Sequence, residues 1–235
     1  DLSADLDFES SIDLVRRWHG ERAFLIGHRL LHGQILAREA ASEWSALADQ
    51  TVCLMARAAE RETIARYGKP PGQWCVAGLG KFGGQEMTAG SDLDLLVIFD
   101  AAHPEEAQTW FTRFTQRLIT ALSAETGEGV LYEVDMRLRP SGRAGPVATS
   151  LASFNRYHSE SAWTWEHMAL TRLRAIAGDK ALGIKVQKDA EHHILNGGHP
   201  IDRTTDILDM RARLHRDKPS MGDWDIKMRS GGLVD

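Results

Sequence analysis

Cysteine is scarce in this sequence, because only Cys53 and Cys75 occur among 235 residues. Two cysteines exclude a disulfide scaffold and a cysteine-based zinc site, and they favour a reducing cytoplasm. The most apolar run, residues 95–99, is far too short to cross a bilayer, so we expect no association with a membrane. The acidic first residues lack the apolar segment of a signal peptide.

A surplus of basic residues is also absent. Lys and Arg together number 28 and Asp and Glu 33, which gives a net charge of -5. Proteins that hold nucleic acids by their phosphates need a basic surface, so this balance argues against nucleic-acid binding. The hydrophobic fraction of 43% and the charged fraction of 26% are typical of a globular protein and argue against wholesale disorder.

Residues 1–69 predict an N-terminal helical segment. Apolar residues recur there at helical spacing until Gly68 and Pro70 give a strong stop signal. We expect Gly20 to interrupt the first helix. The apolar stripe of the next stretch comprises Phe24, Leu31, Ile35 and Leu36.

Residues 70–148 predict a small sheet with one packed helix. Two apolar runs, 74–77 and 92–99, read as buried strands, and a helix is expected to begin at Pro104. Residues 130–140 alternate between apolar and charged side chains, which predicts a third, half-buried strand.

Residues 149–235 predict a C-terminal helical segment that ends in a short strand at 224–228. Trp163, Trp165 and Met168 have helical spacing, so we expect them to pack in the core. Glu166 is expected to pair with Arg172 or Arg174. Together, the three segments indicate an α+β fold.

Three carboxylates are the main candidates for chemistry. Asp92 and Asp94 share one strand face, and their mutual repulsion is relieved by a divalent cation with oxygen ligands. Asp135 would join them if the two strands are neighbours. Three carboxylates with substrate phosphates hold Mg²⁺ ions for phosphoryl-type transfer. The alternative is that Asp92 is only a turn residue at a strand end.

Residues beside these carboxylates suit a phosphate ligand. Gly90 and Ser91 form a turn that can direct backbone N–H groups at a phosphate. Arg137 and Arg139 follow Asp135, and arginine forks match phosphate oxygens. A salt-bridged strand face is the alternative role for either arginine.

A glycine motif at residues 78–83 fits the dinucleotide-binding pattern G-x-G-x-x-G. That interpretation requires a helix that opens inside the motif. Residues 81–91 have further glycines and no apolar periodicity, so we expect a loop there and reject the dinucleotide site.

Several blocks resemble the glutamine synthetase adenylyltransferase family: GLGKFGGQEM at 78–87, GSDLD at 90–94, YEVDMRLRPSG at 132–142 and AWTWEH at 162–167. A weaker block includes residues 225–227 and 231–232. Family members are bifunctional: one domain adds AMP from ATP to a tyrosine of glutamine synthetase and releases pyrophosphate, and a related domain removes AMP by phosphorolysis. The AWTWEH block resembles the C-terminal, adenylylating domain.

The resemblance implies a DNA polymerase beta-like nucleotidyltransferase core flanked by helical segments. It implies Mg²⁺ bound by Asp92, Asp94 and Asp135, with Gly90 and Ser91 at the ATP triphosphate. It further implies control of the whole enzyme by glutamine and the PII signalling protein. Phosphorolytic removal of AMP and a non-catalytic, nucleotide-sensing or partner-docking domain remain alternatives, although retention of Asp92 and Asp94 argues against the latter.

Overall fold

The computed structural model describes residues 7–197, 200–217, 219–222 and 225. The expected strand at 224–228 therefore lies outside the described residues. Among the described helices, none has both the length and the apolar character needed to cross a membrane.

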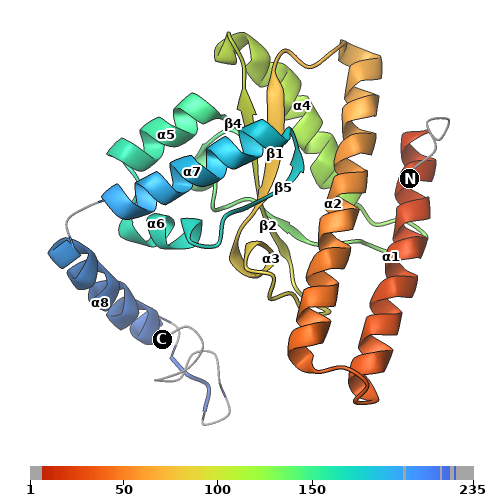
Figure 1. Cartoon of the computed structure of the whole chain (residues 1–235), viewed down its shortest axis with the longest axis horizontal. Coiled ribbons are helices and arrows are strands. Elements are labelled where there is room, and N and C mark those ends of the chain that lie inside the picture. The colour runs from red at the N-terminus through yellow and green to blue at the C-terminus, as the bar shows by residue number, and fades with distance from the viewer. Residues whose placement is uncertain (1–6, 198–199, 218, 223–224, 226–235) are drawn as a thin grey trace.

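Two long antiparallel helices form the N-terminal part, α1 (Phe8–Leu31) and α2 (Ala37–Tyr67), as Figure 1 shows. The prediction of a helical N-terminal segment is thus confirmed. The expected break at Gly20 was wrong, because Gly20 lies inside the continuous helix α1, where glycine lowers helix stability without ending the helix.

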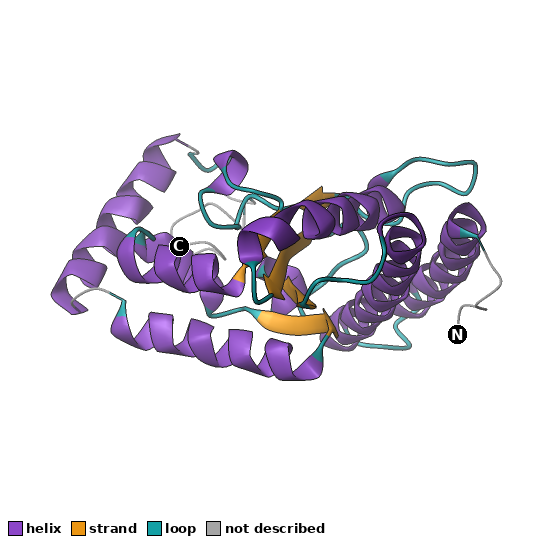
Figure 2. Cartoon of the chain, turned by 90° about the horizontal axis from the view of Figure 1, so that it is seen from above, coloured by secondary structure: helices purple, strands orange, loops and turns teal. Residues whose placement is uncertain are grey.

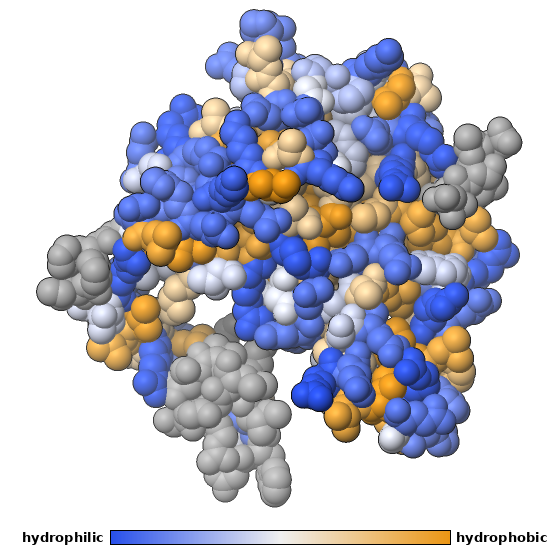
Figure 3. Space-filling model, in the orientation of Figure 1, coloured by the Kyte–Doolittle hydropathy of each residue, from blue (hydrophilic) through white to orange (hydrophobic). Residues whose placement is uncertain are grey.

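The expected apolar stripe at the end of this helix pair was also wrong for most of its members. The side chains of Phe24, Leu31 and Leu36 are 70%, 88% and 59% exposed. Figure 3 shows apolar surface at this end of the two helices. At this end Ile26, Ala40 and Trp44 are the buried residues instead, and Ile12 and Val15 enter the core at the other end of α1.

Five strands make one mixed sheet. They are β1 (Gln73–Gly78), β2 (Leu93–Asp100), β3 (Val134–Asp135), β4 (Ala148–Ser150) and β5 (Arg174–Gly178). β1 pairs antiparallel with β2 and with β5, whereas β3 and β4 both run parallel to β2. The two strands predicted at 74–77 and 92–99 are confirmed. β5 was missed, and it brings part of the expected C-terminal helical segment into the sheet.

Helices cover both faces of the sheet (Figure 2). On one face, α2 and α4 (Pro104–Ser123) pack over Leu93, Leu95 and Val97 of β2. On the other face, α5 (Leu151–Glu160) and α7 (Lys180–Asn196) pack over Leu96 and Ile98. This alternation along β2 places Asp94 on the face of Leu96 and Ile98, at the end of the strand where the side chain is only partly buried.

The segment 130–140 corrects the prediction of a long alternating strand. Only Val134 and Asp135 form strand β3, and the chain then turns at residues 137–140. Arg139, expected on an exposed ionic face, is buried. A short 3-10 helix, Gly142–Ala144, follows the turn. The expected alternation fails beyond Met136 because the turn changes the direction of the side chains.

Two further helices complete the chain, α6 (Thr164–Leu170) and α8 (Pro200–Asp217). The expectation that Trp163, Trp165 and Met168 pack in the core was wrong, because they are 70%, 43% and 41% exposed. Glu166 is buried, but its carboxylate accepts hydrogen bonds from the Tyr157 hydroxyl and the Trp163 backbone N–H. The expected pairing of Glu166 with an arginine was therefore also wrong.

Candidate functional site

A glycine turn follows β1 and lies against Asp94. The turn is the single helical turn α3 (Gly80–Gly83), and the Leu79 N–H donates to the Asp94 carbonyl at 2.9 Å. Gly80 has a φ of +52°, and a Cβ on this residue would overlap the Asp94 Oδ2 atom. Only glycine lets the backbone approach the carboxylate this closely without strain.

The presence of α3 corrects the expectation that residues 81–91 lack a helix. The dinucleotide interpretation fails for a different reason. β1 and β2 are antiparallel neighbours, from Gln73↔Asp100 to Gly78↔Leu95. A dinucleotide-binding unit needs two parallel strands joined by a crossover helix, and here the glycine turn joins an antiparallel pair.

Asp94 and Asp135 lie side by side in the sheet. β2 and β3 pair in parallel with Leu93 opposite Val134 and Asp94 opposite Asp135. Leu93 and Val134 both belong to the core on the α4 face, so both aspartates project from the opposite face. The expectation that these two strands are neighbours is confirmed. Asp92, exposed, precedes β2 on the same side.

The environment of Asp94 opposes its negative charge. The pKa of this carboxyl is raised to about 6. Partial burial is the largest cause, and the nearby negative charges of Asp92 and Asp135 add to it. Arg137 and Lys81 act in the opposite direction. A carboxylate with neighbouring like charges is the environment that a bound cation stabilises.

Asp135 has an arginine partner of its own. Arg137 donates from its backbone N–H to Oδ1 at 2.8 Å and from Nε to Oδ2 at 2.6 Å, and its other guanidinium nitrogen pairs with the same carboxylate. The hydrogen bonds from the Arg137 side chain are the main cause that lowers the pKa of Asp135. Within the described part of the chain, no group of three His, Cys, Asp or Glu residues is arranged to hold one metal ion. The proposed metal-binding role of all three aspartates stays a prediction.

An open cavity of about 520 Å³ lies beside Asp92 and Asp135. Its lining includes Asp92, Asp135, Arg137, Arg139 and Arg143. The volume is in the range of about 300–1,000 Å³ that small-molecule sites occupy. The guanidinium groups of Arg137 and Arg143 are exposed, so they face solvent at the cavity.

The other predicted phosphate-binding residues have different surroundings. Arg139 donates to the carbonyls of Met136 at 2.7 Å and Gly145 at 3.2 Å, which ties the two ends of the 136–145 loop together. The Ser91 hydroxyl accepts from the Thr88 N–H at 2.9 Å, and Gly90 is exposed with open space around it. In this conformation, Arg139 and Ser91 hold loops in place, and their contact with a nucleotide stays a prediction.

Two basic residues near the site were not among the predicted site residues. Lys81 lies on α3, exposed, and its charge acts on the Asp94 carboxyl. Arg174 begins β5 and contacts the far end of α3. Lys81 had a sequence signal, because it lies inside the glycine motif. Arg174 was expected only as a possible partner of Glu166, because its actual partner, Asp49, is 125 residues away in the sequence.

Comparisons with known proteins identify the family of the chain. Residues 2–189 match the family model described as glutamate-ammonia ligase adenylyltransferase. Among relatives named bifunctional glutamine synthetase adenylyltransferase/adenylyl-removing enzyme, the protein of Agrobacterium fabrum is 45% identical over 100% of this chain, and that of Brucella suis 43% over 100%. The one from Bradyrhizobium diazoefficiens is 39% identical over 97% of the chain. The chain spans 24–25% of the length of these three relatives.

Proposed function

Because the chain belongs to the glutamate-ammonia ligase adenylyltransferase family, we propose that it moves AMP from ATP to a tyrosine hydroxyl of glutamine synthetase, with release of pyrophosphate. The observation that carries the proposal is the register of Asp94 opposite Asp135, directly beside the glycine turn at Gly80. Carboxylates, a tight backbone turn and exposed arginines are the groups that a nucleoside triphosphate requires.

The arrangement supports a DNA polymerase beta-like nucleotidyltransferase core as part of the proposal. Its elements are the glycine turn between β1 and β2, the carboxylate pair at the start of β2, and a third carboxylate on the parallel strand β3. The sheet with helices on both faces holds these groups on rigid elements, and rigid placement of reacting groups accounts for much of the rate in this class of reaction.

The donor set fits Mg²⁺. Asp92 and Asp94 offer oxygen ligands only, and Mg²⁺ in nucleotide sites is commonly bound by one or two carboxylates together with substrate phosphates. When bound, the ion would neutralise charge on the α-phosphate and on the leaving pyrophosphate. Arg137 holds the Asp135 carboxylate ionised at neutral pH. That carboxylate is a weak base, so we assign it to orienting the target hydroxyl and to cation binding.

The basic residues complete the proposed site. The positions of Lys81 on α3 and Arg143 at the cavity suit contacts with the triphosphate from two sides. Both side chains are exposed, so their charges are available to an anionic ligand. Arg137 would have to divide its hydrogen bonds between Asp135 and a phosphate oxygen.

The test is incubation of the chain with purified glutamine synthetase, Mg²⁺ and α-labelled ATP. Transfer of label to the synthetase supports the proposal. Label released from pre-adenylylated synthetase only in the presence of phosphate would favour the alternative, phosphorolytic direction. No reaction in either direction, with nucleotide still bound, would favour a non-catalytic sensing domain. Control by glutamine and the PII protein is proposed only for enzymes of the relatives' full length, of which this chain spans about a quarter.

A further inference from the structure

The glycine turn beside Asp94 is too short to be stable alone. α3 contains only four residues, and an isolated helical turn fixes several backbone dihedrals for very few hydrogen bonds. Its last carbonyls have no partners inside the helix. Any contact that holds this turn therefore also determines how Gly80 sits against the Asp94 carboxylate.

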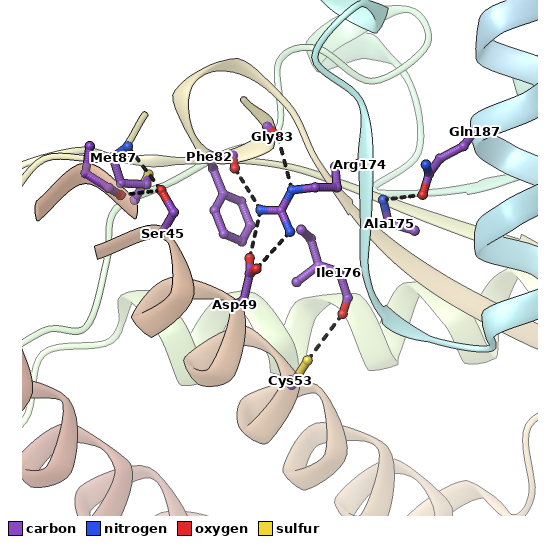
Figure 4. A network of polar contacts seen from close by, with 11 residues as sticks. Ser45, Asp49, Cys53, Phe82, Gly83, Met87, Arg174, Ala175, Ile176 and Gln187 are labelled. Carbon is purple, nitrogen blue, oxygen red and sulfur yellow. Dashed lines mark hydrogen bonds and ion pairs between the residues drawn. The ribbon is translucent and has the colours of Figure 1, made fainter. Parts of the chain in front are cut away.

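Arg174 of β5 supplies that contact (Figure 4). Its Nε atom donates to the Gly83 carbonyl at 3.1 Å, and a terminal nitrogen donates to the Phe82 carbonyl at 3.0 Å. A basic side chain that binds the final carbonyls of a helix stabilises its C-terminal end. The guanidinium carbon also lies 5.7 Å from the centre of the Phe82 ring.

Helix α2 fixes Arg174 in turn. The Asp49 carboxylate accepts hydrogen bonds from both terminal guanidinium nitrogens of Arg174, at 2.8 and 2.9 Å. The Asp49 side chain is 27% exposed and that of Arg174 is 24% exposed. One helical turn earlier, the Ser45 hydroxyl accepts from the Met87 N–H at 3.3 Å, just beyond the glycine turn. Ser45 and Asp49 lie four residues apart, so they face the same side of α2.

We propose that Asp49 and Ser45 of α2, with Arg174 of β5, clamp the glycine turn and thereby position Gly80 and Asp94 for nucleotide transfer. Arg174 lies across α3 from Asp94, roughly 6 Å along a four-residue helix, so it acts as a positioning residue. Helix α2 is then part of the catalytic unit. This inference rests on the proposed function.

The test compares AMP transfer by the full chain and its Arg174→Gln and Arg174→Lys variants. Lysine keeps the charge but cannot reach Asp49 and both carbonyls with one planar fork. We expect kcat to fall about 10- to 100-fold in both variants, because displacement of reacting groups by an ångström is this costly. The KM for glutamine synthetase should stay within about twofold. The double variant Asp49→Asn/Arg174→Gln should be no worse than the worse single variant, as for residues that act as a pair.

The matched control is Arg29→Gln. Arg29 also makes a two-pronged ion pair with a carboxylate of α2, to Glu43 at 2.9 and 2.7 Å, but it does not contact the glycine turn. Its kcat should remain within about twofold of the unmodified chain. An equal loss of kcat in Arg29→Gln would overturn the proposal, because general weakening of α2 would then explain both results.

Hydrogen exchange provides a readout that does not depend on activity. The N–H groups of Gly83, Gly84 and Glu86 are hydrogen-bonded within the turn. They should exchange at least about tenfold faster in the Arg174 variants while the core of α4 is unchanged. Faster exchange throughout the chain, or none in the turn, would overturn the proposal. If Arg174→Gln does not fold, the Asp49→Asn variant is used in its place, and its kcat and the hydrogen exchange of its glycine turn test the proposal. If the unmodified chain transfers no AMP, the proposed function fails, and the exchange data still decide whether the clamp exists.

Discussion

The surroundings of Asp94 disfavour the ionised form of its carboxyl when no ligand is bound. Burial and the neighbouring carboxylates raise its pKa to about 6, whereas the ion pair with Arg137 lowers the pKa of the adjacent Asp135. Two aspartates at one register position of the sheet thus have opposite preferences. Asp94 gains most from a bound cation, and Asp135 is already ionised without one.

Asp94→Asn should abolish most of the transfer activity and still stabilise the protein. We expect activity to fall by about 100-fold or more, as when a charge-stabilising group is lost from an active site. The thermal midpoint at pH 8 should rise by about 2–4 °C, which corresponds to about 1 kcal/mol, because the partly exposed charge is screened by solvent. The control is Asp100→Asn at the other end of β2, where the carboxylate pairs with Lys185. Retained turnover in Asp94→Asn would exclude a catalytic role.

The stability gain in Asp94→Asn should depend on pH. The pKa of Asp94 is higher in the folded protein than its ordinary value of 3.8, so the folded state binds the proton more tightly between about pH 4 and pH 6. The stabilisation from proton binding is complete below pH 4 and is lost as the pH rises through 6. Urea unfolding should therefore give the variant a higher free energy of unfolding than the unmodified chain at pH 8, and a much smaller difference at pH 4.5. An equal difference at both values would contradict the raised pKa.

At the scale of elements, the short turn α3 connects β1 to the site. Gly78 ends β1, Gly80 meets Asp94, and Gly83 fits against the Arg172 carbonyl, where a Cβ would overlap. The glycines in this segment therefore allow its backbone to pack closely against a neighbouring side chain at Gly80 and against neighbouring backbone at Gly83. Several glycines occur together here because the space around the turn leaves no room for a Cβ at these positions.

Gly80→Ala is expected to disable the site without unfolding the chain. A positive φ at alanine costs about 1–2 kcal/mol, and the added methyl group must displace the Asp94 carboxylate. Transfer activity should fall about 100-fold, and the unfolding midpoint in urea should fall. Gly20→Ala is the control, because Gly20 lies inside α1 with open space around it. That variant should gain about 0.5–1 kcal/mol of stability with unchanged activity.

The elements predicted well from the sequence are those whose packing is periodic. The helix from Pro104 places Phe111, Phe114, Leu118 and Leu122 on one buried face, as expected. α7 lies in the segment predicted to be helical, and its own signal is that Asp179 caps a helix in which Leu182, Val186 and Ala190 recur at four-residue steps. β5 has little such signal. Its five residues are a strand because β1 offers an open edge, and that pairing is a tertiary contact.

For the candidate site, the sequence was informative about the carboxylates and much less so about their surroundings. Alternation in residues 130–140 indicated the strand face that carries Asp135, and the pairing of β2 with β3 places it beside Asp94. The same alternation misplaced Arg139, because a turn after β3 directs its guanidinium at backbone carbonyls. Contacts such as Asp49 to Arg174 depend on the folded sheet and leave no local pattern in either segment.

On the scale of the whole molecule, the sheet gathers segments that are distant in sequence. α2 packs against both α4 and β5, and β5 is the strand that carries Arg174 to the glycine turn. α2, the sheet and α4 therefore pack as one unit around the glycine turn, and Figure 1 shows α2 and α4 beside the sheet. A ligand bound at the start of β2 should consequently stabilise the fold as a unit.

Mg²⁺ with ATP should raise the melting temperature of the chain, and EDTA should remove the increase. A ligand that binds only the folded state stabilises it by about 2.7 kcal/mol at roughly a hundred times its dissociation constant, which is about 5–10 °C for a chain of this size. NADH should give no increase, because the antiparallel pairing of β1 and β2 lacks the crossover that a dinucleotide site needs. Asp94→Asn should lose most of the response to Mg²⁺ with ATP, whereas Asp100→Asn should keep it. An increase with ATP that survives both EDTA and Asp94→Asn would locate nucleotide binding elsewhere and separate it from the carboxylates.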